Sequence, residues 1–317
     1  MAKFNSNDYT SKIKVNSKKV FKISLAVYAT ILVAGIILGL IFGVSLDINF
    51  KGGTRIAYQY EGEIAESDFT NGVSEVIDKE FTVSANETMS GTKTFSIALV
   101  GNDSLASDLQ TSLTEKLNEL FPDNNVEVYD SNSVSPTVAG SFFLKSLVAV
   151  IIAAALVVVY VGIRFKKIGG VTAAITALCA LVLDLMVTFV VCVIFRLQID
   201  SNYIAVVLTI LGYSLNDTIV CYDRVRENKK LYPALTTEEN MNLSISGILT
   251  RNIVTSVTTS LAVLTIVVVS EIYGLSSLRT FAIPMTFGLL SGCVSSLFIS
   301  GPLWVYWQEH RSAKKYK

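Results

Sequence analysis

The sequence contains few of the residues from which metal centres and disulfide frameworks are built. It has one histidine, His310, in a basic terminal segment, and its four cysteines all lie in apolar runs. A zinc site needs several His, Cys or carboxylate ligands close together, so a metal centre is not expected. The hydrophilic stretches have no cysteine from which disulfides could form. We expect small, buried hydrophobic residues at Cys179, Cys192, Cys221 and Cys293.

Sequence motifs of enzymes are also missing. We find no phosphate-binding glycine loop with its lysine, no Ser-His-Asp set and no zinc signature. The glycine pairs Gly52–Gly53 and Gly169–Gly170 lack the strand–turn–helix setting of a nucleotide site, so we interpret them as turns. We therefore expect no enzymatic activity, no cofactor and no nucleic-acid partner.

Charge is scarce as well, and long apolar runs take its place. Only 16% of the 317 residues are charged and 51% are hydrophobic, whereas a soluble domain carries about 25% charged residues. The mean hydropathy is +0.52. Runs of about 20 apolar residues cross a bilayer as helices. The sequence predicts six spans, at 22–44, 141–163, 171–195, 203–222, 252–270 and 281–307.

The few charges are distributed unevenly, and this distribution predicts an orientation. Residues 1–22 hold six lysines and one aspartate, whereas 47–140 hold 5 basic and 16 acidic residues. With six spans, the basic ends and the loops at 164–167 and 224–230 share one side, which the positive-inside rule makes cytoplasmic.

Five segments follow from these spans and charges, and we expect the first apolar run to be a retained anchor rather than a cleaved signal. The predicted segments are a cytoplasmic tail (1–21), the first span (22–44), an extracytoplasmic domain (45–140), a five-helix region (141–307) and a basic cytoplasmic tail (308–317).

The predicted extracytoplasmic domain has the pattern of a small α+β fold. Leucines spaced along 104–120 and apolar residues within 66–81 indicate two helices. Strands are indicated within 48–60, at 93–100 and at 125–129, with a turn at 89–93. Allowing two strands between the helices gives the order β-α-β-β-α-β, which is ferredoxin-like. The predicted fold class is thus a six-span α-helical membrane protein with a small ferredoxin-like α+β domain.

An ionisable residue lies inside the fourth predicted span. Asp217 falls about 20 Å along that helix, at 1.5 Å per residue, between the midplane and the cytoplasmic face. Tyr213, Asp217, Cys221 and Arg224 share one helix face, because they are four, four and three residues apart, and Ser214 and Asn216 flank it. One interpretation is a polar helix end whose aspartate reaches cytoplasmic water or caps a neighbouring helix. The functional interpretation is a carboxylate in the bundle interior that binds and releases a proton.

Two further charged residues lie in or beside spans. Asp184 is near the middle of the third span with no basic neighbour in sequence, so it must be neutral or paired across helices. Arg251 opens the fifth span, at the end where Asp217 also lies. Arg251 is either a counter-charge for Asp217 or a boundary residue that snorkels to water. Hydroxyls on its helix, including Thr255 and Thr258, can bond across helices.

Three stretches carry a resemblance to a known family. DINFKGGT (47–54), GYSLNDTIVCYDRVREN (212–228) and RNIVTSVTTSL (251–261) resemble signature blocks of the SecF family. These membrane subunits, with SecD, assist the bacterial Sec export channel and belong to the resistance-nodulation-division superfamily. The resemblance covers nearly the whole chain. It implies use of the proton-motive force to assist late steps of polypeptide export across the cytoplasmic membrane.

The resemblance also implies partners and site residues. The partners are a SecD-like subunit, a SecYEG-type channel, exported unfolded polypeptide and the lipid bilayer. Asp217 and Arg251 would belong to a proton pathway. Many members of the family have a His-Asp pair at the position where this chain has Leu183–Asp184. We therefore expect substitution of Asp184 to affect export less than substitution of Asp217. Two alternatives stay open: a half-transporter for a small molecule or lipid, and a structural scaffold.

Overall fold

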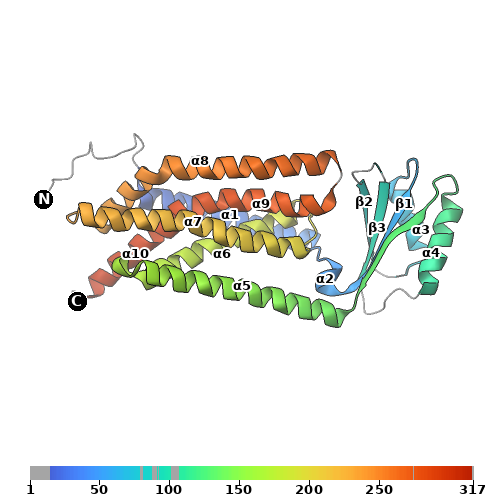
Figure 1. Ribbon diagram of the computed structural model, residues 1–317, viewed down its shortest axis with the longest axis horizontal. Helices are drawn as coiled ribbons and strands as arrows, with labels where there is room; N and C mark the ends of the chain where they lie inside the picture. The colour runs from blue at the N-terminus through green and yellow to red at the C-terminus, as the bar shows by residue number, and fades with distance from the viewer. Residues whose placement is uncertain are drawn as a thin grey trace.

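The structure is mostly helical, with a small sheet at one end of a helix bundle (Figure 1). Six helices in the described part of the chain are long and apolar enough to cross a membrane, which confirms the predicted number of spans. The computed structural model describes residues 15–78, 81–87, 91, 93–100, 107–273 and 275–315.

Five of the spans are single helices, and the sixth is composite. It consists of α9 (Ser276–Ser295), the π-helical turn η3 (Ser296–Ser300) and α10 (Gly301–Lys315). This composite helix and α6 are the most buried, whereas α1 and α5 are mainly exposed on the outside of the bundle. The single helices are α1 (Ser17–Phe42), α5 (Pro136–Arg164), α6 (Gly170–Ile194), α7 (Ser201–Leu231) and α8 (Thr237–Ile272).

Side chains at the helix starts satisfy backbone N–H groups that have no partner within the helix. Ser135 caps α5, and Asp200 accepts from the first N–H groups of α7. Thr236 and Glu239 form a capping box at the start of α8. Gly169 adopts φ +93 between the short η2 (Lys166–Ile168) and α6, which confirms a turn at that glycine pair.

The two ends of the helical part of the chain meet at the end of the bundle away from the sheet (Figure 1). Lys18 Nζ on α1 lies 2.9 Å from Glu309 Oε2 on α10 and 2.6 Å from Glu238 Oε2 on α8. This cluster fixes the start of the first span against the end of the sixth.

The small domain follows the order β-α-β-β-α-β that the sequence predicts. Its four strands form one sheet in the order β2-β3-β1-β4, with every neighbouring pair antiparallel. Its core is a cluster of apolar side chains that includes Tyr58, Phe69, Phe95 and Leu117. The elements are β1 (Gly53–Tyr60), α3 (Glu66–Ser74), β2 (Phe81–Glu87), β3 (Lys93–Val100), α4 (Ser107–Leu120) and β4 (Glu127–Val134).

Several predicted boundaries in this domain need correction. The predicted strand region 48–60 begins with a short helix, α2 (Ile48–Lys51), which Gly52 ends with φ +77. The helix predicted to Phe81 ends at Ser74, because residues from Phe81 onward pair with β3 instead. The last strand begins at Glu127 and extends to Val134. The first residues of the helix predicted at 104–120 and most of the predicted turn at 89–93 lie outside the described residues.

The DINFKGGT stretch forms the junction between the bundle and the sheet. Asp47 N donates to Ile199 O at 3.0 Å, and the buried Asp47 carboxylate pairs with Arg55 of β1. A Cβ on Gly52 would lie 2.8 Å from the backbone of Pro136, so only glycine lets β1 start this close to α5. Asp200 lies nearby, and its carboxylate accepts hydrogen bonds from the Thr280 hydroxyl and from the backbone N–H of Asn202 at the start of α7. Burial raises the pKa of this carboxyl.

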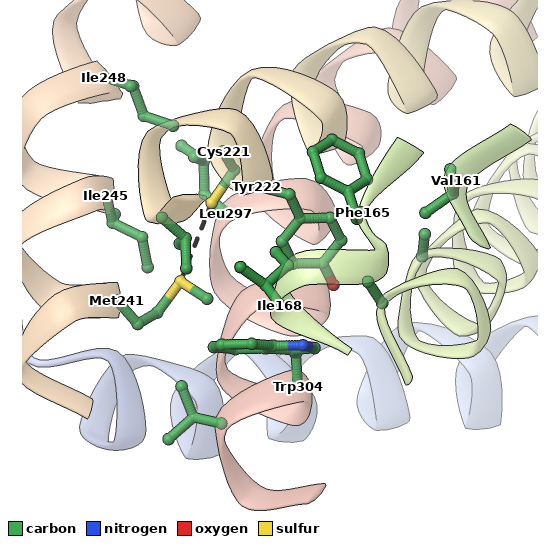
Figure 2. Close-up of a cluster of buried hydrophobic side chains, with 14 of the residues drawn as sticks. Val161, Phe165, Ile168, Cys221, Tyr222, Met241, Ile245, Ile248, Leu297 and Trp304 are labelled. Atoms are coloured by element: carbon green, nitrogen blue, oxygen red, sulfur yellow. Dashed lines mark hydrogen bonds between the residues drawn. The ribbon is translucent and has the colours of Figure 1, made fainter. Parts of the chain in front are cut away.

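The apolar cluster drawn in Figure 2 packs the end of α5 and the start of α6 against α7, α8 and α10. Tyr222 is fully buried there, and its hydroxyl lies 2.7 Å from Thr176 Oγ1 and 2.8 Å from Ser300 Oγ of the π-helical turn. Cys221 Sγ contacts Met241 Sδ of α8 at 3.9 Å. Cys192 and Cys221 are buried as predicted, and Cys293 is partly buried. The prediction is wrong for Cys179, which is exposed on the bundle surface.

Candidate functional site: two buried carboxylates

Asp184 is a fully buried carboxylate at the centre of the bundle. It accepts hydrogen bonds from the hydroxyls of Ser291 (2.6 Å, to Oδ1), Ser214 (2.7 Å, to Oδ2) and Ser295 (2.7 Å, to Oδ2). Ser214 is on α7, and the other two serines are one turn apart on α9. No cation pairs with Asp184 within the described residues. Three hydroxyls thus compensate for the water that the carboxylate loses on burial.

This arrangement suits either protonation state of Asp184. A hydroxyl can donate or accept, so the serines can turn to accept from a neutral carboxyl as well as donate to an ionised one. Tyr28 on α1 extends the cluster, because its hydroxyl lies 2.9 Å from both Ser291 Oγ and Ser291 O. The first span is therefore connected to Asp184 through one serine.

Asp217 is the second buried carboxylate, and it faces α8. It is 3% exposed, so little of this side chain reaches the solvent. Ser256 Oγ donates to Asp217 Oδ2 over 3.4 Å, a long hydrogen bond. Close to Ser256 along the same helix, Asn252 Nδ2 and Ser260 Oγ are buried without a hydrogen-bond partner. Buried polar atoms of this kind usually bind ordered water.

The predicted polar face of α7 is confirmed as one face, and it packs against α8. Tyr213 OH donates to Thr259 Oγ1 at 3.2 Å, Asp217 meets Ser256, and Cys221 meets Met241. Ser214 points to the other side of α7, toward Asp184. The fourth span therefore lies between the two carboxylate centres.

Other predicted residues do not join these centres directly. Arg251 is exposed and forms no ion pair with a described residue. Asn216 is exposed. Thr255 and Thr258 donate to backbone oxygens of α8 itself, as serine and threonine often do in helices. Asp217 and Arg251 thus lie on adjacent helices without being in contact.

Sequence reasoning missed most of the hydroxyls around the carboxylates. Ser291 and Ser295 are four residues apart in an apolar helix, a spacing that places them on one face and could have been noticed. Tyr28 gave no signal, because one tyrosine in an apolar span is ordinary. Ser256 stands among several hydroxyls on α8, and only packing distinguishes it from Thr255 and Thr258.

Fold and site together define a class: multi-pass membrane proteins with a six-helix bundle, a small α+β domain and carboxylates within the bundle. The chain matches the family described as Protein export membrane protein SecD/SecF, C-terminal, over residues 112–310. The chain belongs to this family, on the SecF side. It is 32% identical to Protein translocase subunit SecF of Alicyclobacillus acidocaldarius, over 90% of each chain.

Related proteins include longer chains that are named SecDF. The chain is 34% identical to Protein translocase subunit SecDF of Bacillus subtilis, over 96% of this chain and 38% of that protein. It is also similar to the crystal structure of SecDF from Thermus thermophilus, with a TM-score of 0.78 and 26% identity. The match covers 94% of this chain and 39% of the solved one, so this chain spans about two fifths of a SecDF protein.

Proposed function

We propose that this protein uses the proton-motive force to assist late steps of polypeptide export through the Sec translocase. The relatives are named as protein translocase subunits, and this does not favour the alternative of a half-transporter for a small molecule or lipid. The observation that carries the proton-coupled part is the burial of Asp217 and Asp184 at membrane depth, where hydroxyl groups are their partners.

The two carboxylates fit a proton-driven cycle for electrostatic reasons. An ionised carboxylate in hydrocarbon costs about 2.5–3.5 kcal/mol on insertion scales, so each protonation change alters which packing is stable. A charge that crosses 100 mV is worth about 2.3 kcal/mol. In our proposal Asp217 carries the proton and Arg251 approaches it during part of the cycle. Asp184 supports the pathway through Ser214.

We further propose the surroundings in which this cycle works. The partners are a SecD-like subunit, a SecYEG-type channel and exported unfolded polypeptide. The bilayer is the bacterial cytoplasmic membrane, with both termini, 1–21 and 308–317, in the cytoplasm. The domain 45–140 lies outside and is ferredoxin-like. Its strand order, with both helices on one side of the sheet (Figure 1), supports that assignment.

Transport into membrane vesicles tests the proposal. Inside-out vesicles with the channel, a SecD-like subunit and this protein receive an unfolded reporter, with and without an imposed proton gradient. The wild type should increase the gradient-dependent part of reporter uptake, and the Asp217→Asn protein should not. The matched control is Asp130→Asn, the same change on the exposed strand β4. Full stimulation by Asp217→Asn would contradict the proposal.

A further inference from the structure

A groove separates the last turns of α7 from residues 247–251 of α8, at the end of the bundle away from the sheet. Its volume is about 720 Å³, within the range of ligand pockets, roughly 300–1,000 Å³. Its apolar lining includes Val220 of α7 and Ile248 of α8, and Ile248 also belongs to the buried cluster of Figure 2. Among the described residues, no residue of this groove forms a hydrogen bond or ion pair with Asp184 or Asp217.

Helix lengths place this groove where hydrocarbon gives way to lipid headgroups. A span needs about 20 residues. Counted from the sheet end, 20 residues of α7 end near Val220, and 20 residues of α8 counted back from Ile272 end near Ile253. Both counts reach the same level, and the groove begins there. Arg224 and Arg251, within about one turn of these two positions, therefore lie at headgroup depth, and Lys230 lies farther out along α7.

The charges in the groove do not balance. Four cations and two anions line it. Each anion already has a cation: Arg226 lies 2.8 Å from Asp223, and Arg224 lies 2.7 Å from Glu227. Arg164 lies 3.1 Å from Asp223 as well. Lys230 on the α7 wall and Arg251 on the α8 wall have no acidic partner among the described residues.

We propose that this groove binds the phosphate headgroup of an anionic membrane lipid. Arg251 and Arg224 lie nearest to the membrane boundary, and Lys230 lies farther out along the groove. Basic pockets between membrane helices are suited to such headgroups, because arginine and lysine donate several hydrogen bonds to phosphate oxygens. On the membrane side, Ile253, Val254 and Val257 of α8 are exposed and offer an apolar surface for the acyl chains.

The charge distribution favours a lipid over a free anion. Exposed apolar side chains next to the cations match a molecule that has both a phosphate and hydrocarbon chains. This inference goes beyond the export function and does not depend on it, because it concerns binding by the purified protein. A partner subunit is the other possible occupant, and the experiment separates the two.

Native mass spectrometry of the full-length protein tests the site. The protein is reconstituted in bilayers of phosphatidylcholine with a minor fraction of phosphatidylglycerol and is then extracted into a mild detergent. The mass of the protein with its retained lipids is measured. One phosphatidylglycerol should remain on the wild type. Each basic residue near an anionic surface is worth about 1 kcal/mol, so Lys230→Gln should weaken retention about fivefold. Lys229→Gln is the matched control, because Lys229 is exposed, adjacent and outside the groove.

Three results would overturn the proposal. Equal loss of lipid in the Lys230→Gln and Lys229→Gln proteins would show only general surface attraction. Displacement of the lipid by inorganic phosphate at an equal concentration would show a free-anion site. Cross-linking of a cysteine at position 230 to a co-purified membrane subunit, with no lipid retained, would assign the groove to that subunit. Retention that depends on Lys230 and resists phosphate would support the proposal.

Discussion

At the residue scale, the chemistry centres on Asp217, whose carboxylate is buried but only weakly hydrogen-bonded. Asp217→Asn keeps the shape of the side chain and removes the titrating group. We expect normal insertion and folding with loss of gradient-dependent export. Arg251→Met should cause the same loss, because the approaching cation of the proposed cycle is absent. Uptake of the reporter at matched expression measures both effects, and gradient-dependent uptake at the wild-type level in either variant would refute its assigned role.

Asp184 is held more tightly, so its replacement should affect stability most. Asp184→Leu removes the acceptor that Ser214, Ser291 and Ser295 share. Ser291 keeps Tyr28 and Ser295 keeps Gly292 O, but Ser214 loses its partner among the described residues, and a buried hydroxyl without a partner costs about 1–3 kcal/mol. We expect a large fall in the thermal unfolding midpoint in detergent. Asp184→Asn keeps an acceptor oxygen, so its unfolding midpoint should fall much less. Equal midpoints for the two variants would mean that the serine cluster contributes little.

The sequence-based expectation for activity at this residue remains a prediction. Asp184→Asn should reduce export less than Asp217→Asn, because this chain has Leu183 beside Asp184 at the position where many members of the family have His. Its three short hydrogen bonds make Asp184 the better-defined centre in the structure, so the comparison is informative. Reporter uptake by the two proteins at the same gradient decides it. A larger loss in Asp184→Asn would make Asp184 the principal proton carrier.

At the element scale, glycine allows α9 to approach its neighbours closely. A Cβ on Gly288 would overlap Ile210 of α7 and come within 2.9 Å of Thr188 Oγ1 on α6. Gly288→Ala should therefore destabilise the bundle by about 1–3 kcal/mol through overpacking. Gly212→Ala is the matched control, because a Cβ there meets nothing within 4 Å and alanine favours the helix. Unfolding in denaturant measures both, and equal stability of the two proteins would contradict the close packing.

At the scale of the whole molecule, the bundle fixes which segments share a side of the membrane. In a protein without its native cysteines, a membrane-impermeant thiol reagent added from outside should label Ser131→Cys on β4. Lys229→Cys should react only after the membrane is permeabilised. The physical reason is the basic side-chain excess at the end of the bundle where Lys18 meets Glu309. Labelling of Lys229→Cys in intact cells would reverse the proposed orientation.

The chain also corresponds to only part of the SecDF proteins that it resembles. Its match covers 39% of the solved SecDF chain from Thermus thermophilus. We therefore expect that proteoliposomes with the channel and this protein alone show no gradient-dependent export. Addition of a SecD-like subunit should restore it. Full activity without that subunit would show that these six helices suffice.

The sequence determined the features that depend on local pattern. Apolar run length indicated the six spans, because a helix satisfies its backbone hydrogen bonds within itself in lipid and needs about 20 apolar residues to cross the hydrocarbon. Alternation and helical spacing indicated both helices and three of the four strands of the small domain, whereas the second strand was only allowed for. The spacing of Tyr213, Asp217 and Cys221 fixed a single face on α7, because a helix repeats every 3.6 residues. Each of these follows from residues close together in the chain.

Tertiary structure decided which residues of other helices these side chains contact. Ser291 is 107 residues from Asp184 and Ser295 is 111 residues away, so no local pattern could pair them with that carboxylate. The same holds for Ser256 beside Asp217, and for Arg251, which shares the charged groove with the end of α7 instead of contacting Asp217. Helical spacing predicts which way a side chain points on its own helix, whereas the packing of separate helices decides which partner it reaches.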